Sequence, residues 1–215
     1  MTLVDGVGLW CEISAKDAAG RPAMFLDRDG VIVEEVGYLS RVDDLHMIPG
    51  AAQAIGHCNQ VGVPVVLISN QSGIGRSLFG WDDFAAVQGA LLAALAREGA
   101  HLDAVMACAY HAEAQSPYRI VDHPWRKPNP GMMHEAAARM GLDLANSWVF
   151  GDRANDLAAG RAAPLRGGVL VTTGHGDGER DAALALAHDR FIVKISSSLV
   201  EAIGHPLSLA LEALR

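Results

Sequence analysis

The strongest constraint on the fold of this chain is the alternation of short apolar segments with longer amphipathic ones. The longer segments carry apolar residues at helical spacing, and several of them end at a glycine. Such alternation predicts an α/β protein, a doubly wound and mostly parallel sheet with helices on both faces. The expected strands are 23–26, 63–68, 102–109, 148–150, 168–171 and 191–193, and the expected helices are 51–60, 81–98, 132–140, 155–163 and 199–214, the last interrupted at 204–206.

The N-terminal residues are predicted to form an extension of this core. The segment 9–13 is strand-like, and a turn-rich stretch at 17–22 connects it to the strand at 23–26, so a β-hairpin is expected. We therefore divide the chain into a hairpin extension, residues 1–22, and a core, residues 23–215. Trp10 is expected to cap the edge of the sheet, with a subunit interface as the alternative.

The composition of the chain limits the classes of molecule that it is expected to bind. The net charge of −8 disfavours binding to nucleic acids and anionic membranes, although one local basic pocket could still hold a small phosphorylated ligand. No apolar run approaches the roughly 20 residues of a membrane helix, and the first residues lack the pattern of a signal peptide. Cys11, Cys58 and Cys108 are odd in number and widely spaced, which favours free thiols in a cytoplasmic protein. Monomer and small homo-oligomer both stay open.

Chemically capable residues follow the expected strands. Ligands of open α/β sheets bind beyond the carboxyl ends of the strands, so residues at those ends belong to one site. Asp27 and Asp29 follow the first core strand, within FLDRDG. A close pair of carboxylates suits a nucleophile with a general acid, or a magnesium site. The alternative is a solvated turn, because Asp and Gly favour turns.

Two further loops carry groups that suit a phosphate. The second strand is followed by Ser69 and a glycine-rich stretch to Gly75, whose N–H and hydroxyl groups could cradle an anion. Arg126 and Lys127 precede the helix expected at 132, and a helix N-terminus favours anions. Ordinary solvated loops are the alternative for both.

A second acidic pair follows the strand at 148–150. Asp152 stands at the strand end, and Asp156 falls in the first turn of the next helix, where an acid also suits the helix dipole. Asp152 is then the third carboxylate expected at the same edge of the sheet. The convergence of these loops on one edge predicts a common site more strongly than any loop does alone.

In this order, the segments resemble the haloacid dehalogenase superfamily of phosphohydrolases. The resemblance covers Phe25 to about Gly174 and rests on FLDRDGV, ISNQSG, RKPNPG and GDRANDLAAG. LDRDG together with SNQSGIGR and RKPNPGM is similar to the branch that holds heptose-bisphosphate phosphatases and histidinol-phosphatases. The resemblance implies a phosphatase core with a Rossmann-like sheet, Mg²⁺ as cofactor and an aspartyl-phosphate intermediate.

The resemblance also implies roles for individual residues. Asp27 would attack phosphorus, and Asp29 would act first as acid and then as base. Ser69 and Lys127 would contact the transferring phosphoryl group. The implied magnesium ligands are Asp27, the backbone carbonyl of Asp29, and Asp152, with Asp156 in support. The candidates for substrate contacts are Asn70, Gln71, Ser72, Arg126 and Arg153.

The loops between the motifs are too short for a cap domain over the site. Once the expected helices and strands are removed, only about residues 31–48 and 110–125 remain. Neither stretch approaches the roughly 40 residues that a small independent domain needs. An open mouth is therefore expected, with walls formed by residues 34–44, 74–80 and 110–125.

The loop at 108–126 departs from the resembled branch, in which Cys-x-His and Cys-x-Cys pairs commonly hold zinc. Both later cysteines are absent here, since His123 and Trp125 occupy their places, and Tyr110 stands where the first histidine would be. Packing of tyrosines, prolines and Trp125 is expected to hold the loop, and zinc is not expected. The alternative is an irregular zinc site. Its ligands would be Cys108, His111, Asp122 and His123.

The expected function is magnesium-dependent hydrolysis of a small phosphorylated metabolite. The resemblance implies D-glycero-D-manno-heptose 1,7-bisphosphate, losing its 7-phosphate, as the first candidate, and Arg126 suits a second phosphate. Histidinol-phosphate hydrolysis is an alternative, and a 3′-phosphatase of nucleic-acid ends is disfavoured by the net charge. A non-catalytic phosphometabolite-binding protein is disfavoured because the motif residues are complete.

Overall fold

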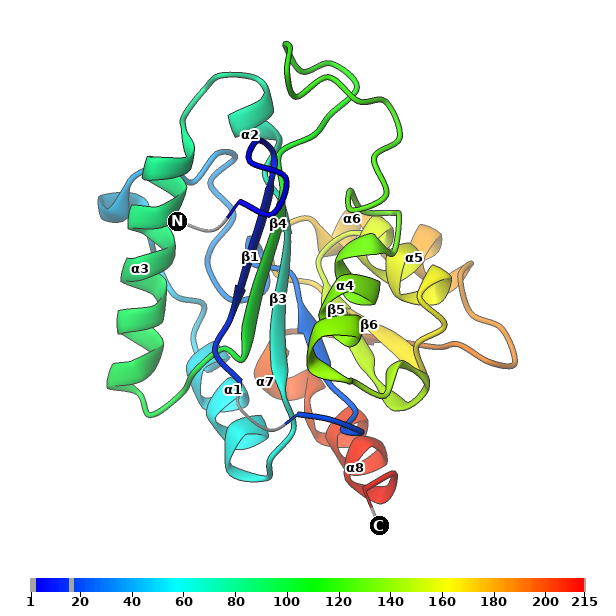
Figure 1. Cartoon of the computed structure of the whole chain (residues 1–215). Coiled ribbons are helices and arrows are strands. Elements are labelled where there is room, and N and C mark those ends of the chain that lie inside the picture. Colours follow the sequence, from blue (N-terminus) through cyan, green and yellow to red (C-terminus); the bar gives the residue numbers. More distant parts are fainter. Residues whose placement is uncertain (1–2, 16–17, 215) are drawn as a thin grey trace.

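The sheet predicted from the sequence is present in the computed structural model, which describes residues 3–15 and 18–214 (Figure 1). Among these residues, seven strands lie in the order β1-β4-β3-β2-β5-β6-β7. All neighbours are parallel except β1, which is antiparallel to β4. The strands are β1 Leu9–Ile13, β2 Met24–Leu26, β3 Val65–Asn70, β4 Ala104–Cys108, β5 Trp148–Gly151, β6 Gly167–Val171 and β7 Ile192–Ser196.

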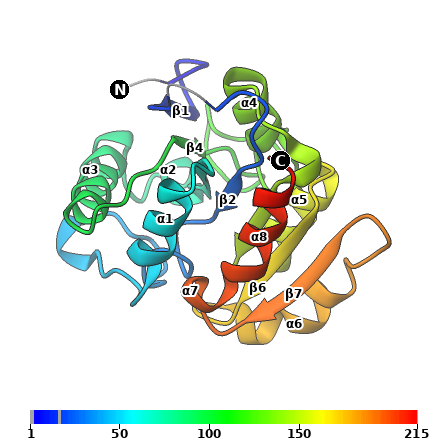
Figure 2. The ribbon, with the colours of Figure 1, turned by 90° about the horizontal axis from the view of Figure 1, so that it is seen from below.

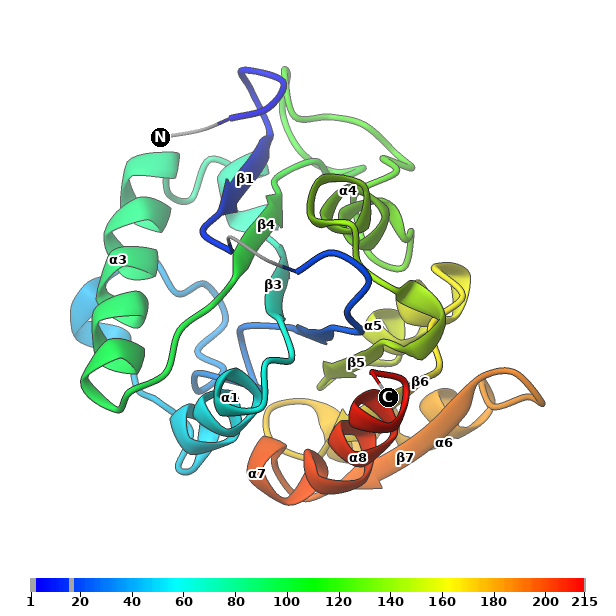
Figure 3. The ribbon, with the colours of Figure 1, turned by 60° about the horizontal axis from the view of Figure 1, so that its bottom comes forward.

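Helices cover both faces of this sheet, as Figures 2 and 3 show from below and from an oblique angle. One core cluster packs α1, α3, α7 and α8 against the sheet, and a second cluster packs α4, α5 and α6 against the opposite face. The helices are α1 Ala51–Gln60, α2 Ser72–Gly75, α3 Trp81–Arg97, α4 Gly131–Met140, α5 Ala154–Ala162, α6 Gly176–Leu184, α7 Leu199–Ala202 and α8 Gly204–Glu212, with short 3-10 turns at Val42–Asp44 and Leu144–Asn146. The predicted fold class is therefore confirmed.

The predicted N-terminal hairpin is wrong. β1 pairs with β4, whereas β2 lies in the middle of the sheet between β3 and β5. The run Met24–Leu26 is buried along its whole length, as expected of a central strand covered on both faces, and its two sides are already paired. The boundary proposed at residue 22 stays a prediction.

Trp10 closes the edge of the sheet, as predicted. Its ring stacks on Trp81 at a centroid distance of 5.8 Å and meets Phe84 edge-on at 5.2 Å, so β1 is attached to α3. The helix predicted at 199–214 is divided into α7 and α8, with Pro206 in the first turn of α8, where a proline is tolerated. Helix α6 was not predicted, because its only buried residues are Gly176 and Ala183 and it therefore has no apolar periodicity.

Four loops leave the carboxyl ends of β2, β3, β4 and β5 at one edge of the sheet. The loops at 27–50 and 109–130 contain no helix or strand beyond the 3-10 turn at Val42–Asp44, in agreement with the predicted absence of a cap domain. Within the described residues, no helix is both long and apolar enough to cross a bilayer.

Candidate active site

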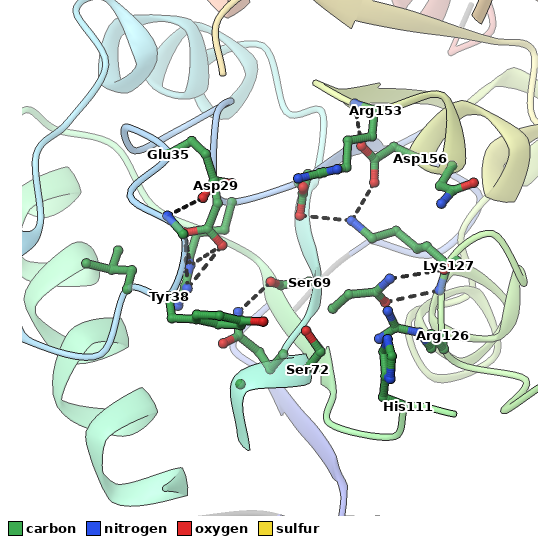
Figure 4. Close-up of a pocket in the computed structure, with 18 of the residues that line it drawn as sticks. Asp29, Glu35, Tyr38, Ser69, Ser72, His111, Arg126, Lys127, Arg153 and Asp156 are labelled. Atoms are coloured by element: carbon green, nitrogen blue, oxygen red, sulfur yellow. Dashed lines mark hydrogen bonds and ion pairs between the residues drawn. The ribbon is translucent and has the colours of Figure 1, made fainter. Parts of the chain in front are cut away.

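A cavity of about 680 Å³ opens at this edge of the sheet (Figure 4). Residues from all four loops line it, so the convergence predicted from the sequence is present. Each residue predicted to contact substrate lies on its wall: Asn70, Gln71, Ser72, Arg126 and Arg153. Their roles stay predictions.

Lys127 joins the two ends of the acidic cluster. Its Nζ lies 2.8 Å from Asp27 Oδ1 and 2.7 Å from Asp156 Oδ1, and it donates to the carbonyl oxygen of Ile68 at 2.9 Å. The side chain is only 3% exposed. Burial alone would lower the pKa of Lys127, but the carboxylates of Asp156 and Asp27 raise it, so the amine stays charged. A fixed ammonium therefore stands beside the predicted nucleophile.

The loop bearing Lys127 is held by the end of β3. Asn70 donates from Nδ2 to the Lys127 carbonyl oxygen at 3.0 Å and accepts from the Lys127 N–H at 3.1 Å. Next to it, buried Ser69 accepts a hydrogen bond from Gln71 Nε2 at 2.7 Å. The Ser69 hydroxyl therefore keeps its own proton to donate toward the cavity.

Asp27 continues the line of β2, because its N–H donates to the Phe150 carbonyl oxygen at 2.9 Å. Asp29 lies on the opposite side of the cavity from Lys127 (Figure 4). Buried Arg28 holds the Asp29 carboxylate, with Nε 3.1 Å from Oδ2 and Nη2 3.2 Å from Oδ1. Burial raises the pKa of Asp29, and the Arg28 guanidinium opposes that shift without cancelling it. A raised pKa suits a group that must donate a proton.

Asp152 occupies a close-fitting pocket behind Asp27. It accepts from the backbone N–H of His175 at 2.9 Å, and only 1% of the residue is exposed. A Cβ added at Gly30 or Gly174 would overlap its carboxylate, so both glycines leave the space that the acid fills. Burial and the neighbouring Asp27 carboxylate raise the pKa of Asp152 to about 7.

The acidic cluster fits a divalent cation. Asp27, Asp152 and Asp156 each offer a carboxylate oxygen, and these oxygens lie within 4.8 Å of one another. The ammonium of Lys127 contacts Asp27 and Asp156 but not Asp152, so this buried group of acids has more carboxyl groups than ammonium groups to pair with them. Hard oxygen donors are what Mg²⁺ prefers. That the backbone carbonyl of Asp29 also ligates the ion stays a prediction.

Arginine side chains line the cavity around the acids. Arg126 donates from Nη1 to the Tyr110 carbonyl oxygen at 3.2 Å. Arg76 contacts Glu113 at 2.9 Å and the Tyr38 hydroxyl at 3.3 Å. Arg153 reaches the cavity from the start of α5 (Figure 4). The cavity therefore has an acidic floor and a rim of arginines.

The four zinc candidates do not form a cluster. Among the described residues, the groups of His, Cys, Asp and Glu side chains that could hold a metal contain none of them. Asp122 accepts from Asn129 Nδ2 at 2.6 Å, and His111 faces Arg76 at 3.3 Å. Only Cys108 and His123 are close, with Sγ 3.9 Å from Nδ1. These side chains do not fit a zinc ion as they stand.

Sequence reasoning missed several side chains that line the cavity. Arg28 was passed over inside the motif LDRDG, and Glu35 and Tyr38 lie in a loop assigned only as a wall. His175 follows β6 and also lines the cavity. Its position just after a strand was the available signal. Glu35, Asp152 and His175 form a second group whose ligand atoms lie within 4.8 Å of one another.

Comparison with known proteins gives concordant results. Residues 124–197 match the HAD-hydrolase-like family. The chain is 49% identical over 150 residues to the D-glycero-beta-D-manno-heptose-1,7-bisphosphate 7-phosphatase of Mesorhizobium japonicum, covering 70% of this chain and 69% of that protein. It is 44% identical over 162 residues to the D-glycero-D-manno-heptose-1,7-bisphosphate 7-phosphatase of Thermosynechococcus vestitus, covering 73% and 82%.

Solved structures agree with these sequence relatives. A HAD-like phosphatase from Mesorhizobium loti superposes with a TM-score of 0.84 at 40% identity, over 96% of this chain and 94% of that one. The D,D-heptose 1,7-bisphosphate phosphatase of B. bronchiseptica, solved with magnesium and phosphate, gives a TM-score of 0.74 at 30% identity, over 87% and 98%.

The sheet, the acidic floor and these relatives together define the class of protein. The chain belongs to the haloacid dehalogenase superfamily, and it is a phosphatase. Relatives of which the chain covers more than two thirds are named as heptose-bisphosphate phosphatases, which agrees with the branch that the motifs resembled.

Proposed function

We propose that this phosphatase removes the 7-phosphate of D-glycero-D-manno-heptose 1,7-bisphosphate in a magnesium-dependent reaction. The observation that carries the proposal is the placement of the Lys127 ammonium between Asp27 and Asp156, at the floor of a cavity with arginines on its rim. The names of the relatives support the choice of substrate. We also propose a cytoplasmic location, consistent with three free and buried cysteines.

In the first half of the reaction, a carboxylate oxygen of Asp27 attacks phosphorus and the bond to the sugar oxygen breaks. Asp29 gives its proton to the departing oxygen, so the sugar leaves as an alcohol and an aspartyl-phosphate remains. Lys127 and the Ser69 hydroxyl donate hydrogen bonds to the phosphoryl oxygens, where charge spreads in the transition state. Bound Mg²⁺, held by Asp27, Asp152 and Asp156, supplies positive charge that lets an anionic carboxylate approach an anionic phosphate.

In the second half, water attacks the phosphorus of the aspartyl-phosphate. Asp29, now ionised, takes a proton from that water, and the bond between phosphorus and Asp27 breaks. Inorganic phosphate leaves, and both carboxyl groups return to their starting states. The Arg28 guanidinium stabilises the ionised form of Asp29 that this step requires.

The rim of the cavity supports a substrate with a second anionic group. Arg76, Arg126 and Arg153 lie around the opening, and arginine is the side chain best suited to phosphate. Histidinol phosphate carries a cationic amine beyond its phosphate, which three arginines would repel. A non-catalytic role is disfavoured because the predicted nucleophile, acid and lysine are all in place.

The test compares kcat/KM on heptose 1,7-bisphosphate, histidinol phosphate and sugar monophosphates, with and without Mg²⁺. We expect the bisphosphate to be preferred and Asp27→Asn to lower kcat by at least about a thousandfold, since removal of a nucleophile has effects of this order. Asp43→Asn changes an exposed carboxylate outside the cavity and serves as the matched control. Equal rates for Asp27→Asn and the wild-type enzyme would contradict the proposal.

A further inference from the structure

The N-terminal segment contacts the loop after β4 through the side chain of Tyr110, in addition to the Ala109 N–H, which donates to the Gly8 carbonyl oxygen at 2.9 Å. The Tyr110 hydroxyl donates to Asp5 Oδ2 at 2.5 Å, and the buried ring stacks on His123 with centroids 4.3 Å apart and planes 17° apart. Asp5 precedes β1, whereas Tyr110 and His123 belong to the loop after β4. One ring therefore joins the beginning of the chain to the loop that also carries Arg126.

The Asp5 carboxylate is itself held firmly. Its Oδ1 accepts from the backbone N–H groups of Val7, Gly8 and Leu9 at 3.0, 2.9 and 3.1 Å. Burial would raise the pKa of Asp5, but the hydrogen bonds from Tyr110 and these amides lower it, so the group is ionised. Gly8 lies against the ring, because a Cβ there would come within 2.7 Å of Tyr110 ring atoms.

The backbone of Tyr110 contacts a residue that lines the cavity. Its backbone carbonyl oxygen accepts from Arg126 Nη1 at 3.2 Å, and Arg126 lines the cavity beside Lys127. His123, under the ring, accepts from the backbone N–H of Trp125 at 3.1 Å. A displacement of Tyr110 would therefore move the carbonyl that orients Arg126 and loosen the turn that leads to it.

We propose that Asp5 is a positioning residue for substrate binding: through Tyr110 it holds the loop at 110–126 so that Arg126 faces the second anionic group of the substrate. The proposal rests on the proposed function for the identity of that group. The Asp5–Tyr110–His123 assembly also stabilises the turn before Trp125, because His123 Nδ1 accepts from the Trp125 N–H.

The test uses Tyr110→Phe, which removes only the hydroxyl and keeps the ring and the backbone carbonyl. Tyr118→Phe is the matched control, because Tyr118 lies in the same loop and no hydrogen bond of its hydroxyl occurs among the described residues. Tyr110→Phe should raise KM for heptose 1,7-bisphosphate by roughly three- to tenfold, on the scale of the net contribution of one ordinary hydrogen bond. Its kcat, and its KM for p-nitrophenyl phosphate, should stay as in the wild-type enzyme.

Two further variants test whether the effect on KM passes from Asp5 through Tyr110. Asp5→Ala should reproduce the rise in KM, and the double variant with Tyr110→Phe should be no worse than Asp5→Ala, because both changes break one contact. Gly8→Ala should act in the same direction by displacing the ring. A zinc-selective chelator should change none of these values. An unchanged KM in Tyr110→Phe, or the same rise in Tyr118→Phe, would overturn the positioning role.

Amide hydrogen exchange separates this proposal from the proposed function. Tyr110→Phe, but not Tyr118→Phe, should speed exchange of the amides in residues 118–126 in enzyme without substrate. A wild-type enzyme that hydrolyses neither heptose 1,7-bisphosphate nor p-nitrophenyl phosphate would contradict the proposed function. The hydrogen-exchange result would then still test whether the contact between Asp5 and Tyr110 holds the loop. Unchanged exchange in Tyr110→Phe would overturn it.

Discussion

The side chain of Asn70 holds the backbone of Lys127 through two hydrogen bonds of 3.0 and 3.1 Å, one to its carbonyl oxygen and one from its N–H. The two residues lie 57 positions apart in the sequence, at the ends of different loops. Because both the nitrogen and the oxygen of the Asn70 amide are bonded to Lys127, the backbone position from which the lysine side chain extends into the site is fixed. The ammonium then reaches Asp27 and Asp156 together.

Asn70→Ala should therefore disturb catalysis through Lys127. The change removes two hydrogen bonds, and a small displacement of a catalytic group costs about 100-fold in rate, so we expect a fall of this order in kcat/KM that includes kcat. Steady-state kinetics measures it. Asn146→Ala, which removes an amide far from the cavity, should leave the rate unchanged. An effect confined to KM would instead support the substrate contact predicted for Asn70.

Gly30→Ala should weaken metal binding. The new Cβ would overlap the Asp152 carboxylate and push it away from its place beside Asp27. Gly20→Ala is the matched control, because Gly20 has the same φ of +74° and open space around its Cβ position. In both variants the new side chain costs about 1–2 kcal/mol, because it is attached to a backbone in the left-handed conformation.

We expect Gly30→Ala to lower Mg²⁺ affinity by at least tenfold relative to Gly20→Ala, as measured by calorimetric titration. Equal Mg²⁺ affinity in the two variants would show that Asp152 does not ligate the cation. The backbone strain is common to both variants, so a difference in Mg²⁺ affinity between them reports the displacement of the Asp152 carboxylate.

Lys127→Met should make folding depend more strongly on magnesium. The change leaves the Asp27, Asp152 and Asp156 carboxylates without their ammonium, and removal of one partner of a buried pair typically costs about 3–5 kcal/mol. Mg²⁺ should restore part of that loss, because it binds only the folded cluster. Urea unfolding with and without Mg²⁺ measures both, and Lys194→Met on β7 is the control. A Lys127→Met protein as stable as Lys194→Met without the ion would contradict the account.

His123 should make the stability of the protein sensitive to mild acid. Burial lowers its pKa, so the folded protein binds this proton less readily than the unfolded chain does. Stability is therefore lost as pH falls from the ordinary histidine value of about 6.5 to the lowered folded value. His123→Phe keeps an aromatic ring under Tyr110 and binds no proton there. Relative to this variant, the melting temperature of the wild-type protein should fall between neutral pH and about pH 5; parallel curves would contradict this assignment.

Much of the candidate site could be predicted from the sequence because its residues stand at the ends of strands or shortly before a helix. Asp27, Ser69, Lys127 and Asp152 come from four separate loops, and the parallel sheet brings these loops to one edge. Strand and helix periodicity located that edge, and the spacing between motifs excluded a cap domain. Each motif could be recognised from a few neighbouring residues. The α/β fold class was then enough to predict that the motifs meet at one edge of the sheet.

Contacts that depend on long-range pairing could not be predicted in this way. β1 pairs with β4, a strand that lies far from it in the sequence. The turn-rich sequence between residues 13 and 23 instead indicated pairing with the next strand, β2. The contact between Asp5 and Tyr110 follows from that pairing and was equally invisible. Arg28 was missed because a charged residue beside two acids is typical of exposed turns, whereas here it is buried against Phe84.

The central claim is that Asp27 is the nucleophile of a bisphosphate phosphatase. The most direct test mixes enzyme, Mg²⁺ and heptose 1,7-bisphosphate, quenches the reaction with acid during the first turnover, and maps phosphorylated peptides by mass spectrometry. The account predicts one acid-stable, hydroxylamine-sensitive phosphoryl group on Asp27, and none in Asp27→Asn. Turnover without that adduct, together with an active Asp27→Asn enzyme, would contradict it.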